Sequence, residues 1–191
     1  ARLRLEAEVI RDGALAATDW LGTRHITEPG VPGYSHIAAP TCYRCPFQLE
    51  YPTCNLLCVQ HLERQIQHEG PDFVAAFIAE PVMQANGVQI PPPEYFPMVR
   101  DICRKYEVLF IGDEIITGFG RTGRMFAAEH WGVRPDILTM AKGITSGYVP
   151  LGAVAVTRAV EDAFSEPLLH LNTYAGHPVA CAPCDRDITR A

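Results

Sequence analysis

The chain has 191 residues, of which 48% are hydrophobic and 20% charged, and its formal net charge is −6. This length and composition are typical of a soluble globular protein with one domain and a buried core. The acidic balance and the scattered arginines exclude a basic nucleic-acid surface, so no nucleic-acid partner is expected. No apolar run has the length of a membrane span, so no membrane partner is expected either.

Within residues 1–53, the stretch 28–47 is rich in proline, glycine and tyrosine, and we expect residues 1–53 to form an irregular N-terminal segment packed on the core. The first residues, ARLRLEAEVIRDG, carry charges throughout and lack the apolar stretch of a signal peptide. The expected location is therefore cytoplasmic. Residues 54–182 have a regular apolar pattern and are predicted to form the core, and residues 183–191 form a separate tail.

The chain has seven cysteines, and Cys42, Cys45, Cys54 and Cys58 are spaced C-x2-C-x8-C-x3-C. Zinc sites with tetrahedral thiolate ligands use cysteine pairs, but the middle spacer here is shorter than in zinc ribbons. The odd total argues against a complete disulfide framework. A metal site and reduced, packed thiols both stay open as interpretations, and we predict the second, with no metal ligands.

After residue 54, segments with apolar residues at helical spacing alternate with short continuous apolar runs. Helical spacing predicts helices at 55–70, 92–107 and 158–164. Short continuous apolar runs predict buried strands at 73–80, 108–114, 136–141 and 152–157. Because strands and helices alternate, the predicted fold class is α/β, with a mostly parallel sheet flanked by helices.

Ionisable residues follow three of these strands. Glu80 ends the first run, Asp113 and Glu114 end the second, and Lys142 follows the third. In open α/β sheets, ligands bind outside the carboxyl ends of the strands, so these residues are expected at one edge of the sheet. Lys142 is one of only two lysines, the other being Lys105. It is either an ordinary charge at a strand end or a reactive amine in a pocket.

A reactive lysine would suit pyridoxal chemistry. A desolvated amine forms a Schiff base with a carbonyl group, and pyridoxal phosphate carries the necessary aldehyde. The ring acts as an electron sink only while its nitrogen is protonated, and this requires a nearby carboxylate. Asp113, at the end of a buried strand, is a suitable carboxylate.

Several longer motifs occur in a fixed order: FIAEPVMQ, GDEIITGFGRTG, GVRPDI, AKG and TYAGHPVACA. With them, residues from about 40 to 182 resemble the class III, pyridoxal-phosphate-dependent aminotransferases of fold type I. The segment CYRCPFQLEYPTC is similar to the branch that contains ω-amino acid–pyruvate and taurine–pyruvate transaminases. The resemblance implies that residues 54–182 are the cofactor-binding large-domain core of such an enzyme.

The resemblance also implies roles for single residues. Lys142 would hold the cofactor as an internal aldimine and move a proton, and Asp113 would pair with the pyridinium nitrogen. Ile115 would pack against one ring face, and Glu80 would lie on the substrate side. Thr173 would contact the cofactor phosphate of the other subunit in a homodimer. The implied reaction moves an amino group from an ω-amine or amino acid to a keto acid such as pyruvate.

Three features of the family are not found in the sequence. These are the glycine/serine turn that binds the cofactor phosphate, an aromatic–His–Gly stretch, and the C-terminal small domain. We therefore expect the chain to be a fragment of such an enzyme. The alternative is a non-catalytic, truncated remnant of the fold that lacks the phosphate site and the small domain.

Overall fold

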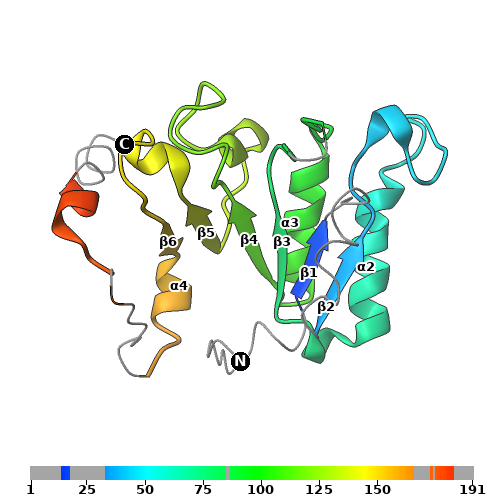
Figure 1. The fold of residues 1–191 in the computed structure, drawn as a ribbon. Helices are drawn as coiled ribbons and strands as arrows, with labels where there is room; N and C mark the ends of the chain where they lie inside the picture. The colour runs from blue at the N-terminus through cyan, green and yellow to red at the C-terminus, as the bar shows by residue number, and fades with distance from the viewer. Residues whose placement is uncertain (1–13, 18–32, 85–86, 166–172, 174, 183–191) are drawn as a thin grey trace.

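A computed structural model describes residues 14–17, 33–84, 87–165, 173 and 175–182 of the chain. Within this part, a six-stranded sheet has the order β2-β1-β3-β4-β5-β6 (Figure 1). The strands are β1 (Ala14–Ala17), β2 (Tyr34–Ile37), β3 (Ala76–Ala79), β4 (Leu109–Asp113), β5 (Ile137–Met140) and β6 (Ala153–Val156). All neighbouring strands are parallel except β6, which is antiparallel to β5. The predicted α/β class is confirmed.

The N-terminal segment differs from the prediction that residues 1–53 are irregular, because β1 and β2 both belong to the sheet. β1 pairs on one side with β2 and on the other with β3. Its sequence, ALAA, has low strand propensity, but pairing on both sides satisfies its backbone donors and acceptors. The division of the chain at residue 53 stays a prediction, and residues 183–191 lie outside the described residues.

The predicted helices are present as α2 (Leu57–Glu69), α3 (Tyr95–Lys105) and α4 (Arg158–Glu161). Gly70, expected to end the first helix, is its C-cap residue and has a φ of 90°. Short 3-10 helices are η2 (Cys42–Arg44), η3 (Pro71–Phe73), η4 (Ala127–Trp131) and η5 (Lys142–Thr145). Among the described helices, none has the length and apolar character needed to cross a membrane.

Helices α2 and α3 lie side by side and share one hydrophobic core with the sheet (Figure 1). Their buried residues are Val59, Leu62 and Ile66 in α2, and Tyr95, Phe96, Val99 and Cys103 in α3. Phe110 of β4 stacks on Phe77 of β3 and on Phe96 of α3, with ring centroids 6.2 and 5.9 Å apart. Because side chains alternate along a strand, Asp113, three residues after Phe110, points to the opposite face of the sheet.

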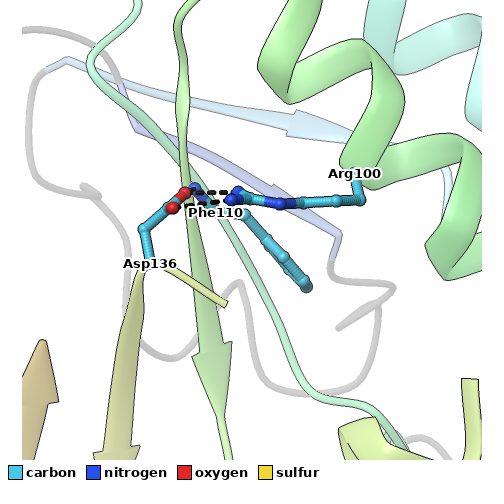
Figure 2. A network of polar contacts seen from close by, with 3 residues as sticks. All are labelled: Arg100, Phe110 and Asp136. Atoms are coloured by element: carbon cyan, nitrogen blue, oxygen red, sulfur yellow. Dashed lines mark hydrogen bonds and ion pairs between the residues drawn. The ribbon is translucent and has the colours of Figure 1, made fainter. Parts of the chain in front are cut away.

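An ion pair joins α3 to the start of β5 (Figure 2). Arg100 donates two hydrogen bonds to the carboxylate of Asp136, with N–O distances of 2.5 and 2.7 Å. The same carboxylate accepts the backbone N–H of Phe110 at 2.9 Å. The two charged side chains are only 16% and 17% exposed, and their hydrogen bond raises the pKa of Arg100. This Arg100–Asp136 clamp fixes where β5 begins relative to β4.

Candidate active site

Three ionisable side chains stand at the carboxyl ends of β3, β4 and β5. Glu80 directly follows β3, Asp113 is the last residue of β4, and Lys142 lies two residues beyond the end of β5. These strands are parallel neighbours, with Ala79 paired to Gly112 and Asp113 paired to Thr139. Their carboxyl ends therefore meet at one edge of the sheet, where the class of fold places its ligands. We call these three residues the charged edge.

Glu80 lies within electrostatic range of both Asp113 and Lys142. Its side chain is half-buried, and its Oε2 accepts the backbone N–H of Gln84 at 3.3 Å. Burial raises the pKa of Glu80, the charge of Asp113 raises it further, and the charge of Lys142 acts in the opposite direction. Glu80 therefore holds its proton more tightly than an exposed glutamate does unless additional positive charge approaches.

Asp113 has one carboxylate oxygen held by the backbone. The N–H of Ile115 donates to Oδ1 at 3.0 Å, which fixes the orientation of the carboxylate. Thr139, the register partner of Asp113 on β5, lies on the same face of the sheet, and its buried hydroxyl has no hydrogen-bond partner in the described part of the chain. Unpaired buried hydroxyls are costly and call for a ligand or water.

Lys142 is exposed and has a φ of 44°, in the left-handed region that ordinary residues seldom adopt. This conformation costs about 1–2 kcal/mol for an L-residue, and such strain is concentrated at functional sites. The following residues keep the backbone in place, because Ile144 is completely buried and the Thr145 hydroxyl donates to the Val149 carbonyl at 2.6 Å.

The turn that carries Lys142 packs against the turn that follows Asp113. A Cβ atom on Gly143 would lie 3.1 Å from the carbonyl oxygen of Gly118 and 3.1 Å from Cβ of Phe119. A side chain here would push the neighbouring backbone away by a few tenths of an ångström, so Gly143 lets the lysine turn lie close to the turn after β4. The structure thus holds Lys142 and Asp113 on two segments that are in contact.

Glu114, the second member of the acidic pair, has a structural position. It is completely buried, and its carboxylate accepts the backbone N–H groups of Ala127 and Ala128 at 3.0 and 2.8 Å. The hydroxyl of Thr117 also donates to it. Glu114 therefore stabilises the start of η4 and the turn between β4 and η4. The sequence offered no signal for this role, because the two amide donors lie 13 and 14 residues away.

The other predicted site residues are Ile115 and Thr173. Ile115 is half-buried directly after Asp113 and Glu114. Thr173 is an exposed turn residue, and no contact within the described residues links it to the charged edge. In the part of the chain that the structure describes, no group of three or more His, Cys, Asp or Glu side chains has an arrangement that could hold a metal ion.

Comparison with known proteins identifies the family. Residues 11–189 match the model of the aminotransferase class-III family, and the chain therefore belongs to the class III aminotransferases. It is 42% identical over 166 residues to the putrescine–pyruvate aminotransferase of Pseudomonas aeruginosa, an alignment covering 84% of this chain and 36% of that protein.

Solved structures show the same relationship. The (S)-enantioselective ω-transaminase of Thermomicrobium roseum superposes with a TM-score of 0.82 at 41% identity, over 94% of this chain and 44% of that one. An amine transaminase from an uncultivated Pseudomonas species, solved in the PLP-bound internal aldimine form, gives a TM-score of 0.86 at 37% identity, over 94% of this chain and 45% of that one. The fold is thus that of PLP-dependent fold type I transaminases, and this chain spans less than half the length of these relatives.

Proposed function

We propose that this chain is part of a pyridoxal-phosphate-dependent transaminase that moves an amino group from an ω-amine or amino acid to a keto acid such as pyruvate. One observation carries the proposal. Parallel strands bring an amine and two half-buried carboxylates to one edge, where neither Lys142 nor Asp113 forms an ion pair within the described residues. The family membership supports the cofactor, and the similarity to a putrescine–pyruvate aminotransferase supports pyruvate as an acceptor.

The charged edge fits this cofactor in chemical terms. A pyridine nitrogen that carries a proton needs a carboxylate, and Asp113 has one oxygen left after its bond to the Ile115 N–H. The buried Thr139 hydroxyl lies beside Asp113 without a partner in the described part of the chain, so this face has an unmet polar group near the carboxylate. Burial of two carboxylates close together, with no cation paired to Asp113 among the described residues, favours a positively charged ligand.

Each residue of the charged edge then has a defined role. Pyridoxal phosphate, when bound, supplies an electron sink for the carbanion formed at the substrate carbon. Asp113 keeps the ring nitrogen protonated, and Lys142 anchors the cofactor and afterwards moves a proton to or from the substrate Cα. Ile115 packs against one face of the ring, and Glu80 lies on the substrate side.

The proposal includes the assembly and the location. The enzyme is a cytoplasmic homodimer with shared active sites, and Thr173 contacts the cofactor phosphate of the other subunit. The exposure of Thr173 is compatible with a contact across an interface. The alternative, a non-catalytic remnant, predicts that the chain does not retain cofactor at the charged edge.

Borohydride reduction separates the two proposals, because it fixes the cofactor permanently on the lysine that carries it. The protein is incubated with pyridoxal phosphate, reduced, digested with trypsin and mapped by mass spectrometry. Modification of Lys142 blocks cleavage and yields peptide 125–158, whereas modification of Lys105 yields peptide 105–121. We expect label on Lys142 alone, and no label in Lys142→Ala.

Lys105 is the matched control lysine. It is 60% exposed and bound to Glu63 at 2.6 Å, and it is the last residue of α3, which leads to the start of β4 rather than to its carboxyl end. Asp113→Asn is expected to reduce the labelling of Lys142 at limiting cofactor, because the ring nitrogen loses its anionic partner. Equal labelling of both lysines, or none at saturating cofactor, would favour the non-catalytic remnant.

A further inference from the structure

A small cavity lies within the loop that joins β2 to α2 (cyan in Figure 1). Its volume is about 20 Å³, which is room for about one water molecule. Four cysteines contribute to its wall and are called the cysteine cluster here: Cys42, Cys45, Cys54 and Cys58. All four are free thiols, and the other lining residues are mostly apolar.

The loop that carries the cysteine cluster is fastened to its surroundings at both ends. The backbone N–H of Ala38 donates to Nδ1 of His61 in α2 at 3.2 Å. Further along, the Tyr51 hydroxyl donates to the carboxylate of Glu94, just before α3, at 3.0 Å. These bonds keep the loop closed over the start of α2, so the four thiols are held together before any reaction takes place.

The thiols influence one another directly. Burial raises the pKa of Cys42, and the charges of Cys54 and then Cys45 raise it further. The pKa of Cys58 is raised to about 11, chiefly by burial, with additional contributions from Cys54 and Cys42. Cys54 thus lies within electrostatic range of Cys42 and Cys58, and all three line the same small cavity. The arrangement does not suit a metal ion, as reported above for the described residues, but two neighbouring thiols suffice for a disulfide.

We propose that Cys42 and Cys54 form a thiol–disulfide exchange site that reacts with low-molecular-weight disulfides such as oxidised glutathione. Cys42 is exposed and accessible to a bulky reagent, whereas Cys54 is half-buried and lines the same cavity. The cavity itself is too small to admit glutathione. Reaction therefore begins at Cys42 and is completed by Cys54.

The exchange has two balanced steps. The thiolate of Cys42 attacks one sulfur of oxidised glutathione, a mixed disulfide forms, and one glutathione thiolate leaves and takes up a proton. The thiolate of Cys54 then attacks the Cys42 sulfur, and the second glutathione leaves in the same way. In total, two protein thiols are oxidised and one glutathione disulfide is reduced to two glutathione molecules.

The attacking species is the thiolate, so the first step depends on pH. Because the pKa of Cys42 is raised, only a small fraction of this group is ionised near pH 7. The rate of disulfide formation should rise about tenfold per pH unit between pH 7 and 8. The site therefore exchanges slowly at neutral pH and faster in alkaline conditions.

Tryptic mapping tests the pairing on the native chain. Trypsin cleaves after Arg44 and separates Cys42, in peptide 25–44, from the other three thiols of the cluster, in peptide 45–64. After treatment with oxidised glutathione and blocking of the remaining thiols, we expect these two peptides joined by one disulfide. The thiol count of the denatured protein should fall by two from seven, and dithiothreitol should restore it.

Serine variants identify the cysteine that forms the disulfide with Cys42. Cys42→Ser and Cys54→Ser should abolish the linked peptides, whereas Cys45→Ser, Cys58→Ser and the control Cys103→Ser should retain them. Cys103 is completely buried in the core, outside the loop. A disulfide confined to peptide 45–64, or a link through Cys45 or Cys58, would overturn the proposal. The urea-unfolded chain is the control for the oxidising treatment. If that control is oxidised while the folded protein keeps all seven free thiols, the proposal is overturned as well.

Discussion

At the start of β5, Asp136 is bound by Arg100 and by the backbone of Phe110, whereas beyond its end Lys142 has no ion-pair partner within the described residues. Only the four residues of β5 and Ala141 separate Asp136 from Lys142. The clamp uses its charges to hold the protein together. The charged edge leaves its charges available and keeps Lys142 in a strained backbone conformation.

The two regions differ in what their charged side chains bind. A charge that is paired inside the protein contributes to stability, and its loss leaves the partner unsatisfied. A charge kept for a ligand contributes nothing until the ligand binds, and the geometry that presents it is itself costly. Substitutions should therefore destabilise the clamp strongly and the charged edge weakly, or even stabilise the latter.

The largest effect is expected at the clamp. Asp136→Ala should lower the free energy of unfolding by about 3–5 kcal/mol, because it leaves the Arg100 charge and the Phe110 N–H without a partner. Urea denaturation measures the change. The control is Glu161→Ala, which breaks the exposed Arg158–Glu161 pair and should cost less than about 0.5 kcal/mol. Equal losses in the two variants would contradict the role of the clamp.

Glu114→Gln sharpens the contrast within the acidic pair. One carboxylate oxygen becomes an amide NH₂ that faces a backbone N–H of Ala127 or Ala128, so we expect a loss of about 2–3 kcal/mol. Thermal or urea unfolding measures it. Glu129→Gln is the matched control: this exposed side chain accepts one backbone N–H, from Phe126 at 2.8 Å, and should lose less than about 1 kcal/mol. A similar loss in both variants would count against the structural role of Glu114.

Lys142 should respond to substitution as a strained residue. Without cofactor, Lys142→Gly should be more stable than Lys142→Ala by about 1 kcal/mol, because glycine adopts a positive φ without steric cost. The same pair of variants at Lys105, in α3, should give the opposite order, by up to about 1 kcal/mol. Denaturation of all four variants checks this prediction, which fails if alanine is the more stable replacement at both lysines.

The smallest effect is a dependence on pH at Glu80. Because its pKa is raised in the folded state, the folded chain holds the proton more tightly than the unfolded chain, and stability falls as pH rises from about 4.5 through the raised value. Glu80→Gln removes this loss, so its stability relative to the wild type should increase over that range and then level off.

Glu63 is a control of opposite sign for this measurement. Its hydrogen bonds to Lys105 and Tyr106 lower its pKa, so its contribution to stability is present above about pH 4.5 and is lost as pH falls through the lowered value. Glu63→Gln should therefore lose stability relative to the wild type as pH rises. Parallel pH profiles of the two glutamine variants would refute the assigned electrostatics of Glu80.

Much of this arrangement was predictable from local patterns. Apolar runs located β3, β4, β5 and β6, and the order of these strands placed Glu80, Asp113 and Lys142 after consecutive parallel strands. Motifs placed the chain in its family. The antiparallel direction of β6 and the strands β1 and β2 were not predicted, because strands of only four residues depend on pairing with neighbours rather than on propensity.

The amino-acid sequence by itself determined the class of fold, the residues of the charged edge and the chemistry that an amine and a carboxylate allow. Only the tertiary structure decided the role of Glu114, the second acid of the pair. Asp113 points away from the helices, whereas Glu114 is enclosed by amide donors distant in sequence. The reason is physical: periodicity reports which residues are buried, but hydrogen bonds between remote segments form only when the chain has folded.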